Sequence, residues 1–303
     1  MELDRLPLSY CFEWDGVDEA TRRRIMAEFA ANGARHIVLA SGLLKQLAGE
    51  PALYRKLAAE LVASGLSFVD AHAPYGDECD LWLPVAEYRP QMIARHKFHL
   101  QLVHDFGVKT CAFHVGNRAY PGYPLATYRD AARRSLEELL PVAEKLDVTI
   151  CLENLYKPLN LPDAILDFIG EFRSEHLGAC FDAGHANILA RGGAYREGTA
   201  FRSCATMNAL PVWDDSVLDK LLPHIVSCHL HDNRVLNDDH DLPGTGTVDW
   251  TTVLSKLRSA PQLRCIQSEV KPVRNRIPVS RLCAAFARLL AAPSGAGNAG
   301  LNE

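Results

Sequence analysis

Residues 148–182 read VTICLENLYKPLNLPDAILDFIGEFRSEHLGACFD, two short apolar segments separated by an amphipathic one. The apolar segments, 148–153 and 177–182, lack polar alternation, which is typical of strands covered on both faces. Residues 160–171 between them have the spacing of a helix. The stretch therefore predicts a β-α-β unit, in which a helix joins two parallel strands.

This unit recurs along the chain. Further strand-like apolar segments lie at 6–12, 36–40, 66–72, 108–115, 225–231 and 263–269. Further helical patterns lie at 18–32, 51–64, 89–106, 127–146, 214–222, 249–259 and 279–291. Eight strand-helix units in strict alternation predict an α/β fold, a (β/α)8 TIM barrel with a single domain over residues 1–291. An open doubly wound sheet is the alternative, and the lack of a GxGxxG turn after the first segment disfavours it.

Two stretches lie outside this pattern. Residues 191–213 form the longest irregular stretch, and because they follow the sixth strand we expect them to cover the catalytic face of a barrel. Residues 292–303 are rich in Gly, Ala, Asn and Ser, which predicts a flexible C-terminal tail.

The composition is that of a globular protein, with 303 residues, 48% of them hydrophobic and 23% charged. There is no apolar run of about 18 residues and no signal-peptide pattern, so no membrane contact is expected. A net charge of -5 does not favour a nucleic acid partner. Nine cysteines without a CxxC pair indicate a reducing, cytoplasmic location. A homo-oligomer is left open, since symmetric assemblies are common.

Histidines and carboxylates gather where the expected strands end. They are His72, His114, Glu153, Asp182, His185, His229, His231, Asp238, His240 and Glu269. In a barrel of parallel strands these ends meet at one mouth. Carboxylates gathered there without a counter-charge would repel one another, and a bound cation removes that repulsion. Imidazole and carboxylate together suit Zn, Mn, Co or Fe, so the pattern predicts a divalent metal site.

Seven short motifs carry a family resemblance. They are HAPY (72–75), FHVG (113–116), CLEN (151–154), CFDAGH (180–185), CHLHDN (228–233), DDHDLPGTGTVDW (238–250) and SEVKP (268–272). Together they resemble the xylose isomerase-like barrel superfamily, and within it the sugar-phosphate isomerase/epimerase group. The endonuclease IV enzymes belong to the same superfamily.

The resemblance implies a ligand set for one divalent ion (Mn, Zn, Co or Mg): Glu153, Asp182, His229 and Glu269. His229 is preferred to His231 because the family's ligand stands three residues before an aspartate, as His229 stands before Asp232. The endonuclease resemblance implies further metal ligands, which match His72, His114, His185, Asp238 and His240. One ion and up to three ions therefore both stay open.

The resemblance implies a metal-dependent isomerase or epimerase of a sugar, sugar phosphate or polyol derivative. Such an enzyme removes a proton beside a carbonyl, and the cation stabilises the enediolate. We expect Glu153 and Glu269 to be the acid/base pair, because their strands lie about half a barrel apart. The expected substrate-binding residues are His185, His72, His114, Trp14 and Arg234: Trp14 to pack on a sugar face and Arg234 to grip a phosphate or carboxylate.

Other functions stay open at this point. Loss of a β-hydroxyl from the same enediolate would make the protein a dehydratase. A DNA-repair phosphodiesterase is disfavoured, because the basic runs at 22–24 and 133–134 lie on expected outer helices and the loops around the mouth are acidic. The sequence Asp182-Ala-Gly-His185 also departs from the Asp-Thr-Cys-His of the endonucleases. A metal-binding barrel without catalysis is the remaining alternative.

Overall fold

Eight parallel strands close into a barrel in the computed structural model, which describes residues 1–291. Consecutive strands pair with each other, and the barrel closes where Ser9 of the first strand lies opposite Gln267 of the last. The strands are β1 (Leu8–Tyr10), β2 (His36–Leu39), β3 (Ser67–His72), β4 (Thr110–Phe113), β5 (Thr149–Glu153), β6 (Leu177–Asp182), β7 (Ile225–Leu230) and β8 (Cys265–Ser268). The predicted single-domain (β/α)8 barrel is confirmed, and the open sheet is wrong. The expected tail at 292–303 lies outside the described residues.

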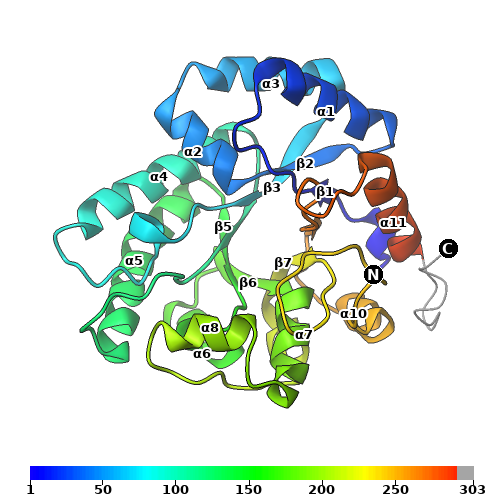
Figure 1. Cartoon of the computed structure of the whole chain (residues 1–303). Coiled ribbons are helices and arrows are strands. Elements are labelled where there is room, and N and C mark those ends of the chain that lie inside the picture. Colours follow the sequence, from blue (N-terminus) through cyan, green and yellow to red (C-terminus); the bar gives the residue numbers. More distant parts are fainter. Residues whose placement is uncertain (292–303) are drawn as a thin grey trace.

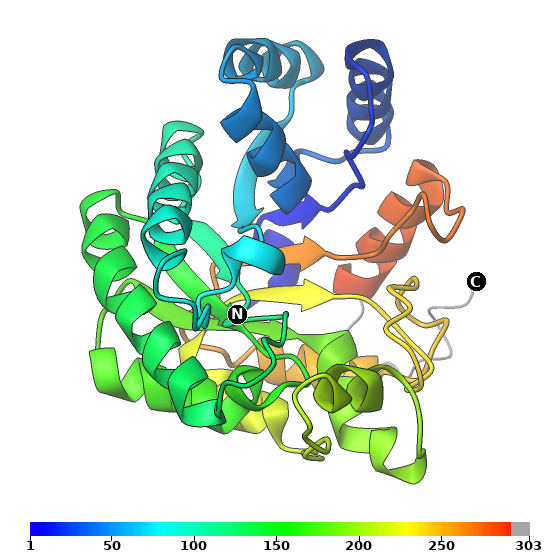
Figure 2. The ribbon, with the colours of Figure 1, turned by 60° about the vertical axis from the view of Figure 1, so that its left-hand side comes forward.

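Helices surround the strands (Figures 1 and 2). The α-helices are α1 (Glu19–Ala31), α2 (Ser41–Gly49), α3 (Leu53–Ser64), α4 (Arg89–Asp105), α5 (Leu125–Lys145), α6 (Pro162–Phe172), α7 (Ala183–Arg191), α8 (Thr199–Ala205), α9 (Val217–Leu221), α10 (Trp250–Leu257) and α11 (Val279–Ala291). Short 3-10 turns are η1 (Leu3–Arg5), η2 (Asp77–Cys79), η3 (Pro158–Asn160), η4 (Gly192–Ala194) and η5 (Leu222–His224). The last helix, α11, packs beside α1 and so completes the outer ring (Figure 1).

Every residue of β4 to β8 is buried, as expected for strands covered by helices on one side and by the barrel interior on the other. The strand ends at the mouth are therefore fixed by packing on both faces. No helix within residues 1–291 is both long enough and apolar enough to cross a bilayer.

The stretch 191–213 is not wholly irregular, because it contains η4 and the seven-residue helix α8. Gly198 precedes α8 with a φ of +111°, a conformation that favours glycine. Tertiary contacts hold the helix: Ala200 and Cys204 are buried, and Cys204 Sγ donates to the carbonyl of Tyr156 at 3.2 Å. A helix of seven residues is too short for sequence periodicity to reveal it, and its stability comes from packing.

Asp232, two residues after β7, organises the loop that leads to α10. Its side chain is fully buried and accepts four hydrogen bonds. The donors are Asn233 N at 2.9 Å, Val248 N at 3.1 Å, Gly244 N at 2.9 Å and Trp250 Nε1 at 2.9 Å. Its backbone also pairs with that of Asp241. Asp232 therefore fixes the path of the segment that carries Asp238 and His240.

We expect Asp232→Asn to lower the free energy of unfolding by about 2–3 kcal/mol, because an amide nitrogen would face N–H donors and the charge that strengthens these bonds is lost. Urea denaturation measures this loss. Amide hydrogen exchange within residues 233–249 should accelerate. The matched control is Asp239→Asn in the same loop, since that carboxylate accepts one bond, from Arg234 N at 3.3 Å. Equal destabilisation by the two changes would contradict the organising role of Asp232.

Candidate metal centre and active site

The chemistry-bearing residues predicted from the sequence do converge at the mouth of the barrel. Most of them lie at or just after the carboxyl end of a strand, so the parallel barrel brings them to one place, and the loop after β7 adds Asp238 and His240. His72, Glu153 and Asp182 end β3, β5 and β6, His229 lies in β7, and His114, His231 and Glu269 directly follow β4, β7 and β8.

The carboxylate of Glu153 lies at the centre of this group and is fully buried. Four imidazoles approach it from four different elements. The distances from Glu153 are 3.2 Å to His72 Nε2, 3.2 Å to His114 Nε2, 3.3 Å to His185 Nδ1 and 3.4 Å to His229 Nδ1. An acidic side chain in the interior needs such partners, because an isolated buried charge is strongly unfavourable.

Glu153, Asp182, His229 and Glu269 each bring a ligand atom within 4.8 Å of the others. His229 Nδ1 lies 3.3 Å from Glu269 Oε2, so it stands between the two glutamates. These atoms are close, yet Glu153 Oε1, Glu269 Oε2 and both ring nitrogens of His229 are buried without a hydrogen bond. Buried polar atoms are normally hydrogen-bonded, so this set is arranged for something other than hydrogen bonds among its members.

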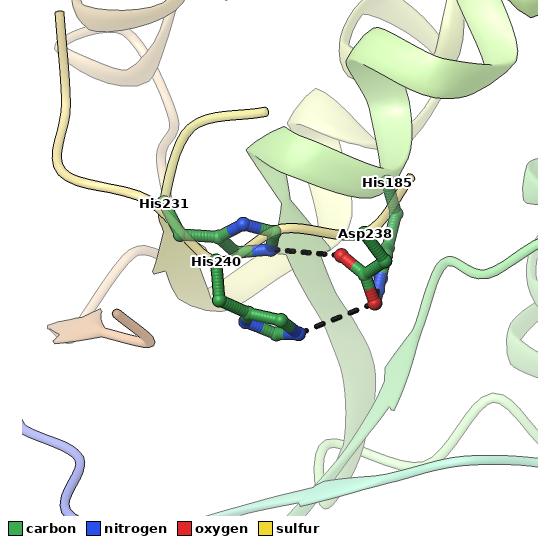
Figure 3. A group of neighbouring side chains, drawn as sticks. All are labelled: His185, His231, Asp238 and His240. Carbon is green, nitrogen blue, oxygen red and sulfur yellow. Dashed lines mark hydrogen bonds and ion pairs between the residues drawn. The ribbon is translucent and has the colours of Figure 1, made fainter. Parts of the chain in front are cut away.

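A second group surrounds Asp238, which lies in the loop after β7. His185 Nε2 and His240 Nε2 each lie 3.2 Å from Asp238 Oδ2, and His231 Nε2 lies 3.9 Å from Asp238 Oδ1. Figure 3 shows His231 and His240 pointing toward this carboxylate. The four side chains together could hold a metal ion. His231 also lies 3.1 Å from Asp182 Oδ2, so this second group adjoins the first.

The electrostatics of the mouth favour ionised Glu153 and Asp238 beside protonated His185, His229 and His231, whereas burial lowers the pKa of His114. Burial by itself would raise the pKa of Glu153, but His229 and His114 outweigh it and hold that pKa well below its usual range. Burial likewise opposes charge on His229 and His185, yet their carboxylate neighbours raise both pKa values well above the usual one. Protons on these rings thus supply the positive charge that the carboxylates require. A divalent cation would displace such protons, as metal binding to imidazole generally does.

Asp182 and His185 are positioned by Asn154, the residue after β5. Its amide pairs with the backbone of Asp182, accepting from the N–H at 2.8 Å and donating to the carbonyl at 3.0 Å. Its own carbonyl accepts a hydrogen bond from His185 Nδ1 at 2.9 Å. Asp182 also caps α7, because its Oδ1 accepts from the N–H of His185 at 2.6 Å. Asp182 therefore serves as a helix cap while its second oxygen faces His231.

A cavity of about 180 Å³ opens above these groups. Its walls include His114, Glu153, His185, Asp238, His240 and Glu269. Tyr75 stacks on His114 with ring centroids 4.1 Å apart. It separates this central cavity from a neighbouring one of about 340 Å³, which is lined by His72, Trp14 and Glu269 among others.

Trp14 and Arg234, which were also predicted to bind substrate, do not line the central cavity. Trp14 is buried in the wall of the neighbouring cavity and packs against Phe12. Arg234 lines neither cavity: its guanidinium is exposed and contacts Asp241 at 3.3 Å and the carbonyl of Thr245 at 2.9 Å. It is therefore already engaged within its own loop.

Several residues that line the central cavity were not predicted from the sequence. They are Tyr75, Tyr156, Lys157, Thr199, Ser203 and Lys271. Two of these stood inside motifs already noted, HAPY and SEVKP, a few residues after a strand end. His231 was predicted to lie at the mouth with His229, but its place in the second group was not predicted. Residues two apart in or next to a strand share one face, which brings both histidines to the mouth.

Solved structures with related folds include a D-tagatose 3-epimerase-like protein, with a TM-score of 0.69 and 18% identity, covering 93% of this chain and 98% of that one. The 3-keto-D-glucoside 4-epimerase from E. coli has a TM-score of 0.66 and 18% identity, covering 95% and 100%. The TTHB071 protein from Thermus thermophilus, soaked with ZnCl2, has a TM-score of 0.62 and 24% identity, covering 94% and 98%. At these identities the similarity establishes the fold.

Curated relatives match over shorter segments. Uncharacterized protein MJ1311 from Methanocaldococcus jannaschii is 26% identical over 147 residues, which are 47% of this chain and 44% of that protein. Uncharacterized protein y4fM from Sinorhizobium fredii is 25% identical over 122 residues, which are 40% and 32%. The chain thus spans less than half the length of the curated relatives it matches.

The family model described as xylose isomerase-like TIM barrel matches residues 17–269, which include all the strands but β1 and all the residues of the two groups that could hold a metal ion. The chain belongs to the xylose isomerase-like TIM barrel family.

Proposed function

We propose that this protein is a divalent-metal-dependent isomerase or epimerase of a sugar or sugar derivative, acting by proton abstraction beside a carbonyl. The observation that carries the proposal is the pair of glutamates at the mouth. Glu153 and Glu269 end strands three places apart in the ring and approach the same His229 nitrogen at 3.4 Å and 3.3 Å. Structural neighbours named as sugar 3-epimerases and a 4-epimerase support this reaction class.

Glu153, Asp182, His229 and Glu269 would hold the cation. The buried atoms of Glu153, His229 and Glu269 that lack hydrogen bonds fit such a role. The mixture of one imidazole with three carboxylates suits Mn, Zn, Co or Mg. When bound, the cation would supply positive charge that stabilises negative charge developing on the substrate's oxygen atoms.

The chain's own residues account for proton movement. A low pKa keeps Glu153 and Glu269 ionised, which is the state that a base requires. One glutamate would take the proton from one side of the substrate, and the other would return it from the opposite side. His185 and His114 line the central cavity and would bind substrate hydroxyls, and His72 would orient Glu153 through its contact at 3.2 Å.

A dehydratase would use the same base and the same cation, and it differs in the fate of the β-hydroxyl. Product analysis by NMR separates the two reactions, since dehydration loses one water per turnover. We place epimerisation or isomerisation first because the neighbours named above support it.

A further ion would bind to the second group, which consists of His185, His231, Asp238 and His240. A third ion would bind to His72, His114 and Glu153. Three such groups keep a phosphodiesterase as the second candidate function. The basic runs offer little free charge to DNA: Arg22 and Arg23 form ion pairs with Glu60 and Glu19, and Arg133 and Arg134 contact acids of α5. We also infer a reducing cytoplasmic location, where the nine unpaired cysteines would stay thiols.

We expect Glu269→Gln to reduce solvent-deuterium incorporation into keto-sugars by about 10²–10⁴-fold, since a neutral amide cannot accept the proton. Mass spectrometry of the recovered sugar gives the rate. Glu138→Gln, an exposed change on α5, should exchange at the wild-type rate. Retention of the full rate by the Glu269 variant would rule out the acid/base assignment.

Protein purified without chelator should contain at least one equivalent of divalent metal per chain. Chelation should lower the melting temperature and abolish exchange, because the clustered carboxylates lose their counter-charge. Metal content should fall as the pH drops, since protons compete for the imidazoles. Mass spectrometry of the elements measures the content.

His229→Asn should remove the first ion, and His231→Asn should lower any second equivalent more than the first, which it touches only through Asp182 at 3.1 Å. His176→Asn, outside the mouth, is the control. An absence of retained metal in the folded wild type would contradict the site. About three zinc equivalents with cleavage of abasic DNA and no proton exchange would instead establish the phosphodiesterase.

A further inference from the structure

One arginine and one lysine, Arg22 and Lys157, are buried within residues 1–291. Their environments differ. Arg22 donates two hydrogen bonds to Glu60, at 2.6 Å and 2.8 Å, so its charge is balanced. Lys157 is 6% exposed and has no carboxylate within ion-pair distance among the described residues. Its ammonium donates to the carbonyl of Asn117 and lies 6.0 Å from the ring of Trp82. Asp80 acts on Lys157 through space and opposes the effect of burial on its pKa, but its carboxylate accepts hydrogen bonds from the N–H groups of Gly76 and Arg118. Lys157 therefore has no direct ion-pair partner among the described residues, which is unfavourable for a buried charge.

Lys157 lines the central cavity above the two glutamates. Burial lowers the pKa of this lysine, as expected for an ammonium removed from water. The nearby acids of the mouth do not serve as its partner, because Glu153 and Asp238 are occupied by histidines at 3.2–3.4 Å. A negative group brought in by a ligand would supply the missing partner.

Other donors face the same space. Lys271, three residues after β8, lines both cavities, and its ammonium forms no ion pair with any residue in the described part of the chain. The hydroxyl of Tyr156 is buried without a hydrogen bond, and burial raises its pKa well above the usual value, so it remains a donor. Ser203 of α8 adds a second hydroxyl to the wall. Lysine ammonium and hydroxyl donors together suit a phosphate or a carboxylate.

We propose that the substrate is an anionic sugar derivative whose phosphate or carboxylate binds to Lys157, Tyr156 and Lys271 in the central cavity. This proposal rests on the proposed function, since it assigns the substrate class of the same site. The cavity volume of about 180 Å³ has room for about six water molecules, enough space for a small sugar unit. The anion at one end would hold the reacting carbon near Glu153 and Glu269 at the other.

The test is isothermal titration of the metal-containing protein with inorganic phosphate and, separately, with acetate. We expect saturable binding of one of them, and Lys157→Met and Lys271→Met should each weaken it about ten-fold or more, since each removes a charge-assisted bond. Tyr156→Phe should weaken it less. Lys97→Met on α4, which breaks an ion pair with Glu138 at 3.7 Å, should bind like the wild type. Preference for phosphate assigns a sugar phosphate, and preference for acetate assigns a sugar acid.

The proposal is overturned if neither phosphate nor acetate binds the wild type. It is also overturned if the anion binds all four variants equally. Should Lys157→Met not fold, Lys271→Met and Tyr156→Phe still test it. Deuterium exchange separates this proposal from the proposed function. Equal kcat/KM for a neutral keto-sugar, its phosphate ester and its acid overturns the anionic substrate and leaves the isomerase intact. Lysine-dependent anion binding without exchange into any of these compounds overturns the isomerase and keeps the anion site.

Discussion

The buried carboxylate of Glu153 is the group around which the mouth of the barrel is arranged. It ends β5 with no exposure to water, and imidazoles from β3, β4, α7 and β7 approach it within 3.4 Å. Such a charge is tolerable inside a protein when positive groups surround it. The neighbouring elements therefore all present histidines to this one point. A site that concentrates carboxylates beside imidazoles with displaceable protons is one that a cation stabilises.

The loop after β7 carries two aspartates with different roles. Asp232 accepts four hydrogen bonds from its own loop and from α10. These bonds stabilise its carboxylate and hold the loop backbone in place. Asp238, six residues later, faces His185, His231 and His240 instead. The rigid first aspartate places the second beside the strand-end ligands. The scaffold, rather than the loop's own propensity, thus determines the geometry of the second group.

The strand-end residues could be predicted from the sequence because a parallel barrel gives every strand the same direction, so position in the chain fixes position at the mouth. The position of His231 at the mouth could also be predicted, since it lies two residues after His229 and shares a face with it. Arg234 was predicted to bind substrate, but local contacts within its loop engage it. Lys157, Tyr156 and α8 lie in connections without periodicity, where tertiary packing decides which side chains face the cavity, and no pattern in the sequence reports that.

A cation site formed by the buried carboxylates and histidines is the basis of the proposed chemistry at the mouth. Anomalous X-ray diffraction from crystals of protein purified without chelator, recorded at the absorption edges of manganese, cobalt and zinc, tests it most directly. We expect an anomalous peak within bonding distance of Glu153, Asp182, His229 and Glu269. The same four side chains in the same places with no peak, after soaking in each metal, would contradict it.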